Sequence, residues 1–122
     1  MAEHENVVAA RRMADAMDVG DMATLDKAIA DDVVWHQIGG PTMHGKDALR
    51  ASMGGADYEI TATTHDIVGN GEHVVALAEA TATRNGKTFK YRTAEIFHIR
   101  DGQVTERWAF SDDTDAIIRF FA

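Results

Sequence analysis

Three turn signals in the second half of the chain constrain its fold more than any other feature. They are Gly69-Asn70-Gly71, Asn85-Gly86 and Asp101-Gly102, and they separate four runs rich in β-branched and aromatic residues. Such sequences favour the tight turns that join antiparallel strands. We therefore predict an antiparallel meander, with strands at Tyr58–Val68, His73–Thr83, Lys87–Arg100 and Gln103–Phe110. Several of these runs are longer than a typical strand, so the sheet should curve strongly.

The first half of the chain is predicted to begin with a helical hairpin. Apolar residues recur at three- and four-residue spacing over Val7–Met17, which is typical of a helix with one buried face, and Val19-Gly20 ends it. Asp21 is a good N-cap for a second helix, which Asp31-Asp32 closes. The β-branched and aromatic run Val33–Ile38 then predicts a first strand.

Two shorter helices complete the prediction. One covers Lys46–Met53 and ends at Gly54-Gly55, and the other is capped by Ser111-Asp112-Asp113 at the C-terminal end. The order is therefore helix, helix, strand, helix, four strands and helix. This order predicts an α+β fold, and 122 residues are the size of a single domain, 1–122.

Composition excludes several classes of partner. Twenty acidic and twelve basic residues give a formal charge of -8, and no Lys/Arg cluster is present to neutralise phosphates, which disfavours nucleic acid. No apolar run approaches the roughly 20 residues that a membrane span needs. The absence of cysteine excludes disulfides and thiolate sites. We expect a soluble, cytoplasmic protein without nucleic-acid or membrane partners.

The sequence also gives no sign of a metal or cofactor. The glycine pairs do not form a phosphate-binding fingerprint, and the six histidines show no pair at ligand spacing. They are His4, His36, His44, His65, His73 and His98. We expect neither a metal nor a cofactor.

The strand Lys87–Arg100 carries the clearest functional signal. Its alternation places Tyr91 and Glu95 on an otherwise largely apolar face. Burial there should favour the neutral carboxylic acid, which suits a general acid or a hydrogen-bond donor. The alternative is that Glu95 pairs with Arg107 or Tyr91 and only organises the interior, because buried acids are usually paired. Tyr91 could donate to a ligand oxygen or pack at the rim of a pocket.

The first strand supplies a second set of candidates. Its alternation turns Trp35 and Gln37 to the same side as Val33, and turns His36 to the other side. Gln37 cannot act as a base, although its amide can orient water or a carbonyl. His36 titrates in the right range for a base, and a shift of the strand by one residue would bring it to the interior.

The segments "GDMATLDKAIADDVVWHQIGGPTMHGKDALR" and "AEIFHIRDGQVTERWAFSDD" resemble the nuclear transport factor 2-like superfamily, and within it the SnoaL-like group. The resemblance covers nearly the whole chain. It implies a curved sheet wrapped by helices into a cone with a pocket at its wide end. Members include ketosteroid isomerase, polyketide cyclases, limonene epoxide hydrolase and scytalone dehydratase, besides binding and assembly modules, so fold leaves function open.

The resemblance also assigns positions. Glu95 falls where ketosteroid isomerase has the carboxylic acid of its oxyanion hole, and Gln37 where it has its general-base aspartate. Trp35 and Gln37 are similar in position to a water-holding pair in limonene epoxide hydrolase. The isomerase's first-helix tyrosine is Met13 here, and the catalytic aspartate of the hydrolase and cyclases falls near Ala109.

Around Ala109 the sequence offers three further candidates. Glu106 or Arg107 could replace the missing aspartate if a bulge shifts the register, and Trp108 could form an apolar wall. The alternative is an aromatic core with a surface salt bridge. Relatives often dimerise through the outer sheet face, which implies a homodimer through a surface that includes Arg92, Ala94, Ile96 and His98.

The sequence therefore predicts a pocket for a small apolar molecule. Its chemistry would be a cofactor-free isomerisation, cyclisation, dehydration or hydrolysis. We expect Glu95, Gln37 and His36 as catalytic residues, and Trp35, Tyr91, Glu106, Arg107 and Trp108 as substrate-binding residues. The alternative is a non-catalytic binding or dimeric interaction module of the same fold.

Overall fold

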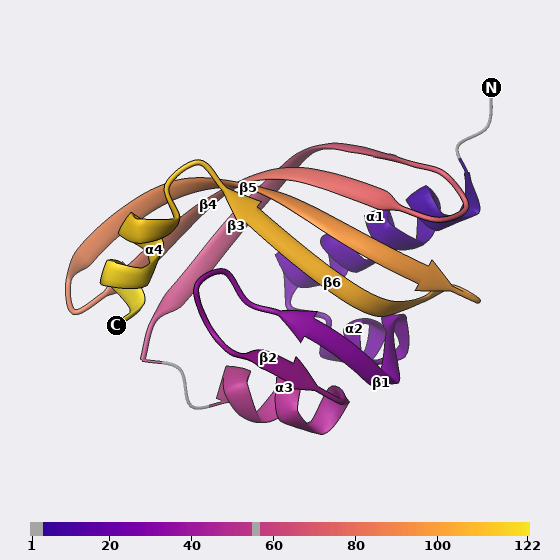
Figure 1. Ribbon diagram of the computed structural model, residues 1–122, viewed down its shortest axis with the longest axis horizontal. Coiled ribbons are helices and arrows are strands. Elements are labelled where there is room, and N and C mark those ends of the chain that lie inside the picture. The colour runs from indigo at the N-terminus through magenta and orange to yellow at the C-terminus, as the bar shows by residue number, and fades with distance from the viewer. Residues whose placement is uncertain (1–3, 55–56) are drawn as a thin grey trace.

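A curved six-stranded sheet with helices packed against it forms the molecule in the computed structural model, which describes residues 4–54 and 57–122 (Figure 1). The helices are α1 (Glu5–Val19), α2 (Met22–Ala28), α3 (Lys46–Gly54) and α4 (Thr114–Phe121). The strands are β1 (Ile29–His36), β2 (Thr42–His44), β3 (Glu59–Gly69), β4 (Val74–Arg84), β5 (Lys87–Arg100) and β6 (Gln103–Ser111). The predicted α+β class with a curved sheet is confirmed.

The strands lie in the order β2-β1-β6-β5-β4-β3. The predicted meander β3–β6 is antiparallel throughout, but β1 pairs with β6 in parallel. The sheet as a whole is therefore mixed, with the predicted antiparallel meander as its larger part. The three reversals of the meander bring β6 alongside β1 in the same direction, which no local sequence signal could reveal.

The ends of the four predicted meander strands agree with the observed ends to within one residue, and the predicted turns explain this agreement. Asn85 and Gly86 have φ values of 52° and 76°, and Asp101 and Gly102 have 52° and 78°. These are the positive angles of two-residue hairpin turns, which Asn, Asp and Gly adopt more readily than other residues.

The helical hairpin is also capped as predicted. Gly20 ends α1 with a φ of 70°, and the Asp21 side chain accepts a hydrogen bond from the Thr24 amide at 3.1 Å at the start of α2. The boundary of β1 differs, however, because this strand begins at Ile29 and includes the exposed Asp31 and Asp32. These acids do not close the helix as predicted.

Two other details complete the comparison. The short strand β2 was not predicted, since three residues carry too little pattern. Helix α3 ends at Gly54, and Gly55 lies outside the described residues.

The concave face of the sheet carries the core. Helix α1 packs against β3 and β4, and α3 packs against β1 and β2. Four alanines of β4 face inward at alternate positions and are buried; they are Ala76, Ala78, Ala80 and Ala82. Their small side chains leave space beneath the sheet that the large side chains of Phe97 and Met13 only partly fill.

Candidate functional site

A cavity of about 200 Å³ lies between α1 and the concave face of the sheet. Its walls are mostly apolar and include residues of α1 and three β4 alanines, and its polar groups come from Asp18, Thr64, Tyr91, Thr93, Glu95 and Arg107. It adjoins a wider hollow of about 470 Å³, roofed by α4 and the loop between β1 and β2. Both spaces are lined by Trp35, Ile38, Ile60, Tyr91 and Arg107. The hollow beneath α4 is therefore the candidate entrance to the cavity.

An ion pair stands inside this cavity. Arg107 Nη2 donates to Glu95 Oε1 at 2.5 Å, and the two side chains are 12% and 25% exposed. The residues lie on adjacent strands, where Glu95 is opposite Ala109 and Arg107 is opposite Phe97. Because alternate residues share a face, both side chains point inward. Charge-assisted bonds of this kind are among the strongest in proteins.

The remaining contacts of Arg107 fix its orientation. Its Nη1 donates to the backbone carbonyl of His36 at 3.0 Å, and its guanidinium lies 4.7 Å from the centroid of the Trp35 ring. A cation over an indole face is attracted by the ring quadrupole. Its buried Nε has no hydrogen-bond partner among the described residues. The guanidinium is therefore held at the junction of β1, β5 and β6.

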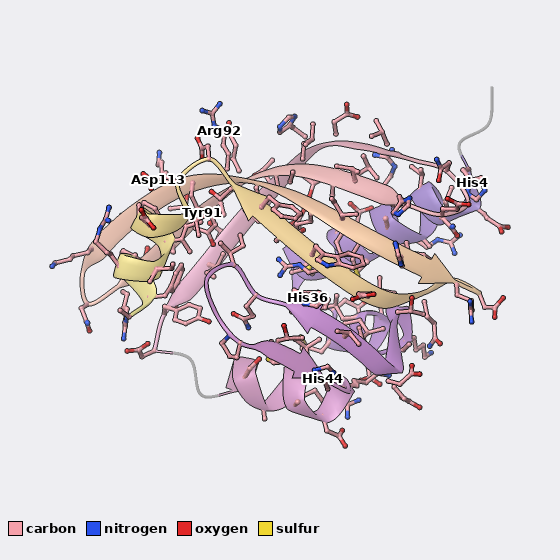
Figure 2. All side chains as sticks on the ribbon, in the orientation of Figure 1. His4, His36, His44, Tyr91, Arg92 and Asp113 are labelled. Atoms are coloured by element: carbon pink, nitrogen blue, oxygen red, sulfur yellow. The ribbon has the colours of Figure 1, made fainter. Side chains whose placement is uncertain are left out.

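Tyr91 supplies a neutral donor near this pair. Its ring stacks on Phe89 with centroids 5.3 Å apart and meets Phe121 edge-on at 6.3 Å. Burial raises the pKa of the Tyr91 phenol, and the negative charge of Glu95 raises it further. Figure 2 shows Tyr91 toward the α4 end of the molecule, where the hollow opens. The phenol therefore keeps its proton at neutral pH and can donate to a ligand oxygen.

We expect this raised pKa to be visible in a titration of the Tyr58→Phe variant, in which Tyr91 is the only tyrosine. The phenol of the unfolded chain has its ionisation midpoint at about pH 10. The folded phenol should ionise at a higher pH than the unfolded phenol. Between these two midpoints the folded state therefore binds more protons than the unfolded state. Its stabilising contribution is present below about pH 10 and is lost as pH rises further.

Phenolate absorbance in buffer and in concentrated urea measures both midpoints. A folded midpoint at or below the unfolded midpoint would contradict the burial of Tyr91.

The structure brings together Trp35, Tyr91, Glu95 and Arg107, but it places Gln37 elsewhere. Gln37 is exposed at the outer hollow, and its Nε2 donates to Met43 Sδ at 3.8 Å. Strand β1 ends at His36, so the chain turns away before Gln37 can reach the cavity. Gln37 could contact a ligand at the entrance, but it does not line the space around Glu95.

The predicted roles of His36, Glu106 and Trp108 inside the pocket need correction. These residues lie on the outer face of the sheet, where His36 Nε2 is 2.7 Å from Glu106 Oε2 and the His36 and Trp108 rings stack at 5.3 Å. Thr42 Oγ1 lies 3.0 Å from His36 Nδ1. Strand alternation turned His36 outward, as the sequence indicated, and the same alternation applies to Glu106 and Trp108. Figure 2 shows His36 on β1 beside β6.

The outer face is also where a dimer would form. It includes the half-buried Ala94, Ile96 and His98 and the exposed Arg92 and Phe110. The homodimer stays a prediction.

The entrance contains a contact that the sequence analysis missed. Gly39 has a φ of 65°, and a Cβ there would lie 2.3 Å from Ile118 Cγ1 of α4. Only glycine allows α4 to approach the loop so closely. The sole sequence signal was the Gly39-Gly40 pair, which also fits an ordinary turn.

The described residues contain no group of three or more His, Asp and Glu side chains placed to hold a metal ion. Their helices also include none that is long and apolar enough to cross a membrane.

Comparison with known proteins identifies the family to which this fold belongs. A SnoaL-like domain model matches residues 10–107, which is most of the chain. The chain belongs to the SnoaL-like family. This family lies in the nuclear transport factor 2-like superfamily, so the resemblance found in the sequence is confirmed. Among curated proteins, none matches the SnoaL-like chain in sequence.

Three solved structures illustrate the similarity of this SnoaL-like domain to others. A protein of unknown function with a cystatin-like fold from Xanthomonas campestris is 27% identical, with a TM-score of 0.85 over 96% of this chain and 98% of that one. IdmH of Streptomyces antibioticus, a proposed polyketide cyclase, is 24% identical, with a TM-score of 0.73 over 98% and 100%. An epoxide hydrolase of Mycobacterium tuberculosis, like limonene epoxide hydrolase, is 20% identical, with a TM-score of 0.77 over 93% and 86%. The last two similarities show the fold alone.

Proposed function

We propose that the cavity binds a small, largely apolar molecule through one oxygen atom and promotes a cofactor-free acid/base reaction on it. The observation that carries this proposal is the Glu95–Arg107 ion pair, which lies beside Tyr91 in a cavity with otherwise mainly apolar walls. Apolar walls with a few convergent polar groups are typical of small-molecule sites.

The three polar side chains suit different parts of such a reaction. A guanidinium has five N–H donors, so Arg107 can donate to a ligand oxygen while keeping its bonds to Glu95 and His36. Tyr91 is a second donor. Arg107 and Tyr91 together could stabilise negative charge that develops on the ligand oxygen. Glu95 uses Oε1 toward Arg107, and its carboxylate can accept a proton from the ligand or from water.

This arrangement changes the role that we expected for Glu95. The sequence pattern predicted a neutral acid that donates, whereas the contact with Arg107 favours an acceptor, and the donor role passes to Arg107 and Tyr91. Isomerisation, cyclisation, dehydration and hydrolysis all need such a pairing of donor and acceptor. The epoxide hydrolase and proposed cyclase among the structural neighbours support an enzyme by fold only.

One observation favours a non-catalytic binding module instead. The positions that carry chemistry in the relatives considered above hold Gln37, Met13 and Ala109, and none of these side chains can transfer a proton. In that case the ion pair would only hold a ligand oxygen.

Binding and turnover of small oxygenated compounds distinguish these functions. We would measure binding of para-ethylphenol, cyclohexenone and cyclohexene oxide by calorimetry, and follow conversion of the last two by gas chromatography. For an enzyme we expect conversion that Glu95→Gln reduces by about 100-fold or more, because general acid/base groups contribute that much.

Glu79→Gln is the matched control. Glu79 is an exposed carboxylate on the outer face of the adjacent strand, so its loss should leave conversion unchanged. Arg107-dependent binding without conversion would establish the binding module, and absence of binding by all three compounds would reject both functions.

A further inference from the structure

A second, smaller apolar hollow lies on the far side of two methionines and a tryptophan. It has a volume of about 80 Å³ and lies among α1, α2, α3 and β1. Met13, Met17 and Trp35 line both this side pocket and the main cavity. Its other apolar walls include Met22, Leu25 and Leu49.

Met13, Met17 and Trp35 separate the two spaces, and Met17 is the exposed one among them. Methionine is unbranched and flexible, and it adapts to irregular spaces. Met17 and Met22 are 53% and 60% exposed, so either can change rotamer without leaving a cavity in the core. Trp35 is different, because Arg107 lies over its ring and holds it in place. A passage would therefore open at Met17 rather than at Trp35.

The charged groups at the rim of the side pocket already have partners. Lys46 Nζ donates to the Asp26 carbonyl at 2.7 Å and lies 3.2 Å from Asp31 Oδ1, while Arg50 is paired with Asp26. The rim therefore offers no unpaired cation to a charged ligand. The interior instead suits a hydrocarbon group.

We infer that the side pocket takes the apolar tail of a ligand whose oxygen lies at Glu95, Arg107 and Tyr91. This inference rests on the proposed function and narrows its substrate class to molecules with a polar head and an alkyl chain. The chain would pass from one space to the other at Met17, which lines both.

The volume limits how much of the tail can enter. A hollow of 80 Å³ has room for roughly three groups of the size of a water molecule or a methylene. Each methylene that leaves water for an apolar site tightens binding by about fourfold. Three methylenes in the side pocket should therefore contribute about 50-fold in affinity.

The test is a series of para-alkylphenols, from ethyl to octyl, titrated by calorimetry into the unmodified protein and into Leu25→Trp. The larger indole should fill the side pocket from its α2 wall. We expect the variant to bind para-ethylphenol normally and the long phenols about 50-fold more weakly than the unmodified protein does. Leu25→Phe is a smaller change and should cause a smaller loss of affinity for the long phenols. It replaces the tryptophan variant in the test if that variant does not fold.

Val8→Trp is the matched control, because Val8 is exposed on α1 and lines neither space. Equal chain-length dependence in all variants would overturn the tail pocket, while Arg107-dependent binding of para-ethylphenol would leave the proposed function standing. Leu25-dependent binding of long phenols that does not require Arg107 would support the side pocket and reject the proposed function. If no phenol binds, both are rejected.

Discussion

Replacing Arg107 by methionine is expected to weaken binding of para-ethylphenol by about 10- to 100-fold, because a hydrogen bond from a charged group is lost. The same change should lower the free energy of unfolding by about 3 kcal/mol, since it leaves the carboxylate of Glu95 in the cavity without its cation. The lower part of the usual range applies because Glu95 retains some contact with solvent. Calorimetric binding and urea denaturation measure the two effects.

The double variant Glu95→Gln/Arg107→Met separates loss of the pair from loss of packing. Most of the lost stability should return in it, because no unpaired charge remains. Arg92→Met is the matched control, since Arg92 is mostly exposed and its contact with Asp112, at 3.4 Å, lies on the surface. Equal destabilisation by Arg107→Met and Arg92→Met would show that the ion pair contributes little to the fold.

Filling the cavity from β4 is expected to weaken ligand binding without harming the fold. In Ala78→Leu the added carbons take up roughly three methylene volumes of the 200 Å³ space. A ligand that would otherwise bury about three methylenes in this space should bind about 50-fold more weakly. Stability should change by less than about 1 kcal/mol, because the new side chain enters a void rather than a packed region.

Ala82→Leu provides the contrast on the same strand and face. Ala82 is fully buried but does not line the cavity, so a larger side chain there must displace its neighbours. We expect a loss of about 1–3 kcal/mol in stability and unchanged binding. If Ala78→Leu is as destabilising as Ala82→Leu, the space beside Ala78 is not available to a ligand.

Local signals explain which parts of the fold could be predicted. Turn residues with positive φ, such as Asn85 and Asp101, determine the hairpins without help from the rest of the chain. The start of β1 at Ile29 depends instead on pairing with Val104 of β6, which lies far away in sequence. Two aspartates at positions 31 and 32 look like the end of a helix, and only this distant pairing makes them part of a strand.

The same difference between local and long-range signals explains which residues of the candidate site could be predicted. Alternation along β5 was enough to place Tyr91 and Glu95 inside, and the pairing of Glu95 with Arg107 was an alternative that the sequence left open. Gln37 was misplaced because the end of β1 depends on the loop beneath α4. The side pocket behind Met13 and Met17 has no sequence signature, since a methionine at helical spacing looks like ordinary core.

The two faces of the sheet are joined at His36. Its carbonyl accepts from Arg107 on the cavity side, while its imidazole contacts Glu106 and Thr42 on the outer side. The parallel pairing of β1 with β6 shifts register between Ile29 and Val34. A slip by one residue would break both sets of contacts at once. A change in the outer-face contacts of His36 should therefore also shift the carbonyl that accepts from Arg107.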